Sequence, residues 1–554
     1  MKLRKSAWLL LCLTLAMSLF LAACSGGNTA EETPPADEPE EETPAEQPSS
    51  DEPVYGGDIV VGSIGAPTLF NPLYSTDVSS SDIEGFIYNG LVTGDTEFNP
   101  VNDLATDVQM SEDGLTFTVK LRDDVKWHDG EQFNADDVVF TFGIPKDPDY
   151  AGERGSAFES LESVTKIDDY TVEFKLSQID ATFHQITLSY GILPEHILGE
   201  VPVGDLGEHE FNTKSPIGTG PFKFEEWRDG EYVKVVANED YFEGRPYFDS
   251  ITYKIVPDQN ALLAQLQAGD VDFTTVPGTD VETAKAFPGV KIESGLALSY
   301  TYLAFNLQQE RFNDVKIRQA MTHAIDRQAI VDSVMDGDGE VAHVPESPLS
   351  WAYNDDVPTF DYDPEKAKTL LAEAGWEDTD GDGILDKDGE PFSFTIKTNQ
   401  GNKIREDIVV VLQQQLKEVG IEAKPEIVEW SAYIEQISAP NWDFDAMVLG
   451  WSLSTFPDQY DIFHTSQREA GLNMHWYSNA EADKLMEDAR QILDQDEYKE
   501  IYGEIYKILA EEQAYTFLYY PNVHRAMPEN MQGYEFHAKS DFYNINKWWF
   551  AEQQ

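Results

Sequence analysis

Cysteine is almost absent from this chain of 554 residues, which holds only two. Both lie near the start, at Cys12 and Cys24. Beyond Cys24 the chain therefore has no disulfide, no cysteine nucleophile and no cysteine metal ligand, so packed cores must stabilise the fold.

Basic residues are also scarce. The chain has 38 Lys and Arg against 102 Asp and Glu, a formal net charge of −64. Nothing supplies the clustered cations that displace counterions from phosphate, so nucleic acid is excluded as a partner. An acidic surface keeps a protein soluble and away from anionic lipid, but it does not define the ligand.

Motifs of the common hydrolases and nucleotide-binding enzymes are missing. Ser163 to Lys166 fits only the bare Ser-x-x-Lys pattern, and Gly218-Thr-Gly220 has no third glycine. His128 and Asp129 are adjacent on an expected turn, where the two side chains rarely face each other, so we interpret the pair as structural. The sequence predicts no enzyme; an exported hydrolase built from scattered carboxylates is the remaining enzymatic alternative.

The N-terminus has the pattern of a secretory signal. Basic residues precede an apolar run that begins near Ala7 and ends in Leu21-Ala22-Ala23-Cys24. These last four residues resemble a lipobox, which predicts a signal peptide over 1–23, a lipidated Cys24 and an extracytoplasmic protein anchored to a bacterial cell membrane. The alternative is an ordinary secreted protein in which Cys24 is incidental. Residues 24–53 are acidic and rich in proline, which predicts a disordered spacer.

The remaining chain reads as a globular α/β protein of two or three domains. Alternating apolar residues over 115–121 and 171–176 predict two antiparallel strands. Helical spacing is found over 83–91, 261–268, 312–331, 403–419, 481–493 and 497–509, with a buried strand expected over 515–520. Asn134, Asp363 and Gly269 are expected to cap helices.

An aromatic group surrounds the apolar segment 447–460, in which Gly450, Trp451 and Ser452 follow a strand. A strand, then a glycine-tryptophan turn with Ser, Thr and Asp nearby, suits one wall of a ligand cleft. We predict ligand contacts from Trp451, Asp458, Ser452, Gly450 and, on the tyrosine-rich strand 298–306, Tyr300. For most of the other rings, core packing is the preferred interpretation.

The acidic segment 378–389 resembles the start of an EF-hand loop, with Gly383 in the sixth position. The expected calcium ligands are Asp378, Asp380, Asp382, the Ile384 carbonyl and Asp386. The twelfth position is Gly389 rather than a bidentate Glu, so a solvated acidic turn is the alternative. Apart from this structural calcium, no cofactor is expected.

Six motifs in order resemble the family 5 extracellular solute-binding proteins, the peptide- and nickel-binding receptors of ABC importers. They are Val125-Lys-Trp-His-Asp-Gly, Ile217-Gly-Thr-Gly-Pro-Phe, Val315-Lys-Ile-Arg-Gln-Ala-Met with Ala324-Ile-Asp-Arg, Ser347-Pro-Leu-Ser-Trp-Ala-Tyr-Asn, Pro364-Glu-Lys-Ala-Lys-Thr-Leu-Leu-Ala-Glu-Ala-Gly-Trp and Gly450-Trp-Ser. The resemblance implies a periplasmic-binding-protein-like α/β fold whose two lobes close on a ligand, with an extra inserted domain. It places domain I at 54–92, 217–306 and 521–554, domain II at 93–216 and domain III at 307–520.

The same resemblance implies a monomer that binds a short peptide and delivers it to a permease driven by ATPase subunits. Trp451 matches the tryptophan that lines the family's pocket. Phe456 stands where peptide-binding members usually carry an aspartate for the peptide's α-ammonium, which leaves Asp458 as a substitute or a ligand without that amine. A nickel complex or a sugar is the alternative solute, and a surface signalling or adhesion receptor is the alternative class.

Overall fold

The computed structural model describes residues 52–469 and 471–551. The predicted signal peptide, Cys24 and nearly all of the predicted spacer lie outside this range. Among the helices within it, none has the length and apolar character needed to cross a bilayer.

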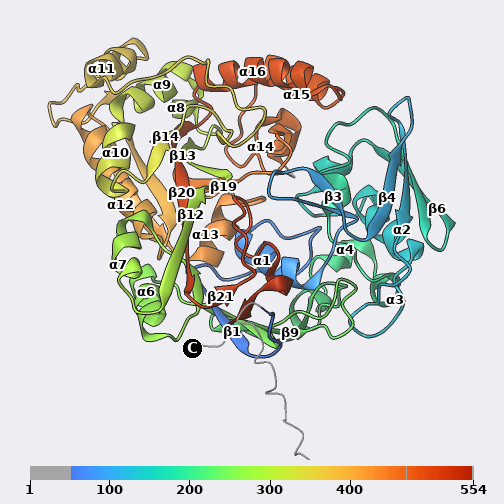
Figure 1. Ribbon diagram of the computed structural model, residues 1–554. Helices are drawn as coiled ribbons and strands as arrows, with labels where there is room; N and C mark the ends of the chain where they lie inside the picture. The colour runs from blue at the N-terminus through green and yellow to red at the C-terminus, as the bar shows by residue number, and fades with distance from the viewer. Residues whose placement is uncertain (1–51, 470, 552–554) are drawn as a thin grey trace, which may run out of the picture. The chain divides into compact units, whose positions relative to one another are not determined.

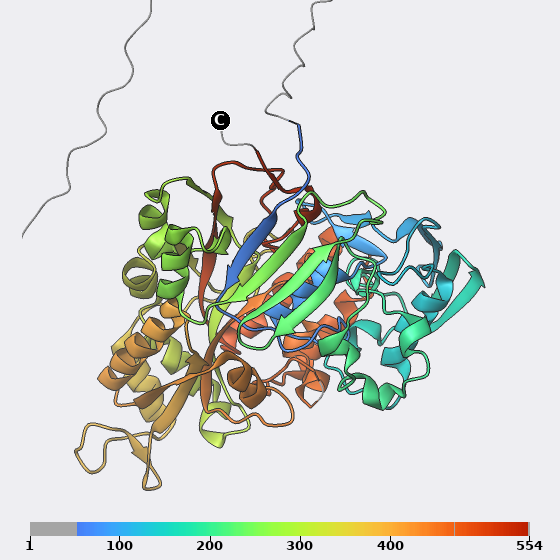
Figure 2. The same cartoon turned by 90° about the horizontal axis from the view of Figure 1, so that it is seen from below.

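A 12-stranded mixed sheet forms the centre of the fold (Figure 1). Its main path runs β18 (Glu422–Val428), β17 (Ser393–Asn399), β19 (Ala446–Ser452), β13 (Ser299–Phe305), β20 (Thr516–Pro528), β11 (Phe273–Thr275), β1 (Asp58–Ser63), β10 (Ser250–Ile255), β9 (Tyr232–Ala237) and β8 (Phe222–Arg228). β12 (Val290–Leu296) and β14 (Gly339–Val341) also pair with β20. Figure 2 shows β1, in blue, beside the green strands of its half of the sheet.

Strand β20 joins the two halves of this sheet. Its first half pairs with β13 and β14, and its residues from Asn522 onward pair with β12 and β11. The predicted strand over 515–520 is therefore only the beginning of a longer one. The chain crosses between the halves at two places, in β20 and in the link from β12 to β13, as a pair of hinges requires.

Two large buried apolar clusters correspond to these halves. One gathers residues from Leu298 to Tyr520, and the other combines residues from Ile59 to Phe273 with the C-terminal segment around Trp548. We call residues 298–520 the second lobe, and residues 52–92, 217–297 and 521–551 the first lobe. The predicted domain boundaries stay a prediction, and the buried contacts of β13 favour a division near residue 297 over one at 306.

The segment between the two early parts of the first lobe, residues 93–216, carries its own antiparallel sheet. It consists of β4 (Ala105–Met110), β5 (Thr116–Leu121), β7 (Thr171–Leu176) and β6 (Leu161–Asp168) in that order. The two predicted strands pair directly, with Phe117 opposite Phe174. We call residues 93–216 the inserted segment.

Sixteen α-helices occur in the described residues. They are α1 (Val78–Ile87), α2 (Ala135–Gly143), α3 (Glu195–Leu198), α4 (Val203–Leu206), α5 (Phe211–Lys214), α6 (Gln259–Ala268), α7 (Val281–Lys285), α8 (Glu310–Asn313), α9 (Val315–Ala324), α10 (Arg327–Val334), α11 (Pro364–Glu373), α12 (Lys403–Glu418), α13 (Trp430–Ile437), α14 (Tyr460–Phe463), α15 (Ala480–Ala489) and α16 (Gln495–Glu511). Three short two-stranded sheets complete the described part: β2 (Val92–Gly94) with β3 (Pro100–Asn102), β15 (Asp386–Lys387) with β16 (Glu390–Pro391), and β21 (Met531–Gln532) with β22 (Trp549–Phe550).

Local capping chemistry sets several helix ends. Asn134 forms a capping box at α2, Asp363 caps α11 ahead of a proline, and Gly269 ends α6 at φ 75°, all as predicted. The helix expected over 83–91 lies earlier in the chain, as α1, because the Asp77 side chain accepts from Ser80 N and starts the helix at Val78. The helix expected over 312–331 is divided, because Asp326 caps a new helix, α10, at Arg327.

Candidate ligand-binding site

The centre of the candidate site is a stack of three aromatic rings on β13, β19 and the start of β20. Tyr302 stacks on Tyr515 with ring centroids 4.1 Å apart, and on Trp451 at 6.3 Å. The Trp451 indole Nε1 donates to the Tyr515 hydroxyl at 3.4 Å. These contacts hold the half-buried Trp451 ring in one orientation at the end of β19. We call Tyr302, Trp451 and Tyr515 the aromatic wall.

Gly450 gives Arg405 room to reach the strand. A Cβ atom at position 450 would lie 3.0 Å from Arg405 Nη2 and 3.2 Å from the Tyr300 carbonyl oxygen. Arg405 comes from the first turn of α12, and its Nη1 donates to Asn399 Oδ1 at 2.9 Å. Among the described residues, no carboxylate lies within 4.0 Å of its guanidinium, so the cation is available to an anionic group beside β19.

Arg405 was not among the predicted ligand contacts, although its position carries a signal. A cation in the first turn of a helix lies at the positive end of the helix dipole, which disfavours it. Asn402 caps α12 and places Arg405 three residues further on, so its position there needs a compensating reason. An anion at the site would supply one.

Tyr300 and Ser452 lie beside Trp451 but differ in accessibility. Tyr300 pairs with Trp451 across the β13–β19 ladder and is fully buried, whereas Ser452, opposite Ser299, is exposed. Burial raises the pKa of Tyr300 well above its usual value. Among the described residues, the Tyr300 hydroxyl has no hydrogen-bond partner, which leaves a buried polar atom beneath the wall.

The wall ends where the two lobes meet. Leu453 N donates to the Leu298 carbonyl at 2.9 Å, and Lys539 Nζ of the first lobe donates to the Leu453 carbonyl at 2.9 Å. Burial lowers the pKa of Lys539 to about 8. The structure thus brings together Gly450, Trp451, Ser452 and Tyr300 at the lobe junction.

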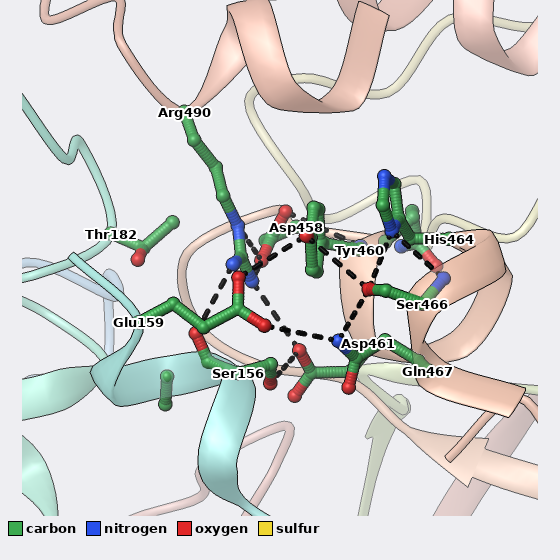
Figure 3. Close-up of polar contacts among 12 residues, drawn as sticks. Ser156, Glu159, Thr182, Asp458, Tyr460, Asp461, His464, Ser466, Gln467 and Arg490 are labelled. Atoms are coloured by element: carbon green, nitrogen blue, oxygen red, sulfur yellow. Dashed lines mark hydrogen bonds and ion pairs between the residues drawn. The ribbon is translucent and has the colours of Figure 1, made fainter. Parts of the chain in front are cut away.

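Asp458 lies apart from them, in a polar cluster between the second lobe and the inserted segment (Figure 3). Its Oδ2 accepts from Arg490 Nε at 3.1 Å, and its Oδ1 accepts from the Tyr502 hydroxyl at 2.7 Å. Both carboxylate oxygens therefore have protein partners. The predicted amine-binding role of Asp458 stays a prediction that this geometry does not favour.

The partly buried Phe456 packs against an aromatic group. Its ring makes edge contacts with Trp351 at 5.7 Å and with Tyr498 at 5.1 Å between centroids. An apolar side chain at this position therefore has a packing role that an aspartate could not fill.

The acidic loop over 378–389 brings three of its carboxylates together. Carboxylate oxygens of Asp378, Asp380 and Asp382 lie within 4.8 Å of one another, and all three residues are exposed. Asp386 accepts instead from the Thr379 amide at 2.9 Å and from its hydroxyl at 2.6 Å. Three of the five predicted calcium ligands thus converge, and the calcium site stays a prediction.

His128 proves to be a structural residue. Its Nδ1 accepts from Gly218 N at 3.2 Å, and its Nε2 lies 3.0 Å from the Gly220 carbonyl. Burial lowers its pKa to about 4, so the imidazole is neutral at physiological pH. The exposed Asp129 pairs with His196 rather than with its neighbour. This pair forms no catalytic arrangement.

Comparison with known proteins places the chain in a family. The profile of the bacterial extracellular solute-binding proteins, family 5 middle, matches residues 99–473. The oligopeptide-binding protein AppA of Bacillus subtilis is 57% identical over 555 residues, which cover 100% of both chains. The structure of that AppA with a nonapeptide superposes with a TM-score of 0.90 and 60% identity over 90% of this chain and 100% of that one.

A more distant structure shares the fold. NikZ of Campylobacter jejuni, solved in complex with Ni(L-His), has a TM-score of 0.81 at 28% identity and covers 89% of this chain and 99% of that one. The predicted α/β solute-binding fold and its family resemblance are confirmed. The chain belongs to the family 5 bacterial extracellular solute-binding proteins, and it is an extracytoplasmic binding protein rather than an enzyme.

Proposed function

We propose that this protein captures short peptides between its two lobes and presents them to an ABC importer. Its full-length similarity to the oligopeptide-binding AppA, and to the AppA structure that holds a nonapeptide, supports a peptide as the ligand. The observation that carries the proposal is local: the ordered aromatic wall ends where the lobes join, beside the exposed Ser452. Arg405, which has no carboxylate within 4.0 Å among the described residues, lies against Gly450, the residue before Trp451.

Each part of this site has a task in peptide binding. The Trp451 ring supplies apolar area for a ligand side chain, and the exposed Ser452 offers polar groups to a peptide backbone laid along the strand end. Arg405 supplies a cation for a ligand carboxylate, either the C-terminus or an acidic side chain, because a guanidinium bonds carboxylates through two parallel hydrogen bonds.

The test uses the mature domain without residues 1–53 and a library of short peptides. Titration calorimetry with one bound peptide, its C-terminally amidated form and its N-acetylated form will show which terminus matters. Arg405→Gln should weaken binding of free-acid peptides by roughly 10- to 100-fold, since a charged hydrogen bond contributes about 1.5–3 kcal/mol. Lys417→Gln, on the exposed part of the same helix, is the matched control. Equal affinities of Arg405→Gln and the parent for every peptide would remove Arg405 from the site.

The membrane attachment belongs to the same proposal. A lipid on Cys24 would hold the receptor beside a permease and its ATPase subunits, with residues 25–53 as the spacer, and one copy of the chain would act at a time. Cys24→Ala should release the protein into the medium and abolish incorporation of labelled fatty acid. Retention of Cys24→Ala in the membrane would contradict lipid anchoring at this residue.

A nickel–amino acid complex is the second candidate ligand. The similarity to NikZ, solved with Ni(L-His), favours it over other small solutes. The same calorimetry decides between them: peptide binding without nickel supports the first candidate, whereas binding that requires both nickel and histidine supports the second.

A further inference from the structure

The inserted segment touches the second lobe through a compact set of polar contacts around Arg490 (Figure 3). Arg490 Nη1 donates to the Ser156 carbonyl at 3.3 Å, and Ala181 N donates to the Arg490 carbonyl at 2.7 Å. The Ser156 hydroxyl donates to an Asp461 carboxylate oxygen. Ser156 belongs to a 3₁₀ turn over Gly155–Phe158 in the inserted segment.

A second group of contacts crosses the same seam. Glu159 of the inserted segment accepts from the Tyr460 hydroxyl at 3.2 Å and from Gln467 Nε2 at 3.4 Å. Gln185 Nε2 donates to the Thr455 hydroxyl at 3.0 Å. We call these contacts of Ser156, Glu159, Ala181 and Gln185 with the second lobe the seam.

The hydrogen-bonded charge pairs of Arg490 stay within one lobe, although Asp180 and Arg154 of the inserted segment also act on the cluster through their charge. Arg490 is bound by Asp458 at 3.1 Å and by Asp461 at 3.3 Å, and its guanidinium lies 3.8 Å from the Tyr460 ring centre. All these partners belong to the second lobe. Separation of the seam therefore breaks hydrogen bonds from Ser156, Ala181 and Gln185 but leaves the buried arginine paired. Glu159 would exchange both of its partners for water, and Asp461 would lose the Ser156 hydroxyl but keep Arg490.

This arrangement suits a contact that must open repeatedly. Removing one partner of a buried ion pair is strongly unfavourable, whereas a single hydrogen bond, even one to a charged group, can be exchanged for water with a smaller net change. The inserted segment joins the first lobe at both of its ends, so no covalent link to the second lobe prevents separation. The seam can thus open and close with the lobes.

The seam is also close in sequence to the ligand site. Thr455 and Asp458 follow Trp451 on one loop, which leads into α14 at Tyr460. Asp458 on this loop and Asp461 on α14 both bind Arg490. Contacts that hold this loop against the inserted segment therefore also fix the segment that follows the aromatic wall. Through this loop, the inserted segment can affect ligand release without contacting the aromatic wall itself.

We infer that the inserted segment is a clasp: its seam contacts with the second lobe stabilise the closed form and so set the residence time of the bound ligand. The inference rests on the proposed ligand-binding function and adds a role for residues 93–216. Since only closure is affected, the clasp acts on the dissociation rate more than on the association rate.

The experiment compares Ser156→Ala, Glu159→Gln and the double variant with two controls from the inserted segment, Ser163→Ala and Glu162→Gln. The side chains of both control residues lie on β6, and Glu162 is exposed. Peptide dissociation is followed by stopped-flow fluorescence. Closure is followed by distances between spin labels on Glu112→Cys and Glu500→Cys, two exposed positions in a mature domain that has no other cysteine after Cys24 is omitted.

We expect each single clasp variant to raise the dissociation rate by roughly 3- to 10-fold, since one net hydrogen bond corresponds to a factor of this size. The double variant should raise it further, the association rate should change less than about 2-fold, and the label distances should shift toward the open form. The two control variants should behave as the parent does.

If the folded double variant keeps the dissociation rate and the label distances of the parent, the proposed role of the inserted segment as a clasp is overturned. The ligand-free protein supplies a separate test, because loss of seam contacts should shift its label distances as well. If the parent binds no peptide, the proposed function fails, and the ligand-free distances alone decide the clasp. A shift that also appears in both control variants would assign the effect to general loosening and overturn the inference.

Discussion

Asp458→Asn distinguishes a structural carboxylate from a ligand-binding one. The change removes a negative charge while it keeps the size of the side chain and one oxygen acceptor. In the parent protein the Asp458 and Arg490 side chains are only 4% and 9% exposed, and the two groups lie in hydrogen-bond contact. The variant should leave Arg490 with Asp461 as its only carboxylate partner among the described residues.

The size of the effect follows from this burial. Loss of one partner of a buried ion pair destabilises a protein by about 3–5 kcal/mol. The amide oxygen can still accept from Tyr502 and Arg490, and Asp461 keeps part of the compensation, so we expect about 2–3 kcal/mol. For a lobe of some 200 residues this corresponds to a decrease in Tm of roughly 5–10 °C.

Two measurements check the prediction: thermal unfolding by circular dichroism, and affinities for a free peptide and its N-acetylated form. We expect a lower Tm and an unchanged ratio of the two affinities. Asp356→Asn, an exposed aspartate of the same lobe, should leave both unchanged. An unaltered Tm combined with a selective loss of affinity for the free amine would refute our assignment and restore Asp458 to the ligand site.

Three further predictions follow from single features. Trp451→Ala removes the apolar ring that is proposed to cover a ligand side chain. Loss of about 1.5 kcal/mol of apolar burial should lower the peptide affinity measured by calorimetry roughly 10-fold, with the fold retained by circular dichroism. Unaltered affinity would exclude Trp451 from the site. Burial raises the pKa of Glu346 to about 8, above its ordinary value of 4.5. Between these two pH values the folded protein keeps the proton that the unfolded chain loses, so the free energy of unfolding should fall as pH rises from about 4.5 to 8. Glu346→Gln should lessen the decrease in Tm between pH 5 and pH 8, and an identical decrease in the variant would count against this carboxyl. Calcium bound at the acidic loop should raise the Tm and slow hydrogen exchange near Asp380, and EDTA should reverse both effects. Asp380→Asn should abolish the response. No response to calcium in the parent protein would indicate a solvated turn.

Local signals predicted local structure well. Asn134 and Asp363 cap helices where the sequence indicated, because a side-chain oxygen and a nearby amide suffice for a cap. Alternation identified β5 and β7 as strands of antiparallel structure, and the two pair directly with each other. The start of α1 was misjudged because the Asp77 side chain, which accepts from Ser80 N, begins the helix at Val78, ahead of the apolar spacing.

The ligand site was only partly predictable. Trp451 and Gly450 stand on one strand, so a single stretch of sequence identified them. Arg405 lies on another element and reaches Gly450 only through the arrangement of α12 beside the sheet. Asp458 seemed free in the sequence because its partner, Arg490, is 32 residues away and meets it only in the folded lobe.

Native mass spectrometry of the mature domain, purified without denaturation, tests the central claim most directly. The ligand is released in the instrument and sequenced. We predict a set of short peptides of mixed sequence, one per protein molecule, that is lost or diminished from Trp451→Ala. An empty protein that a peptide library also fails to stabilise, or a nickel complex in place of peptides, would contradict the proposal that this chain is a peptide receptor.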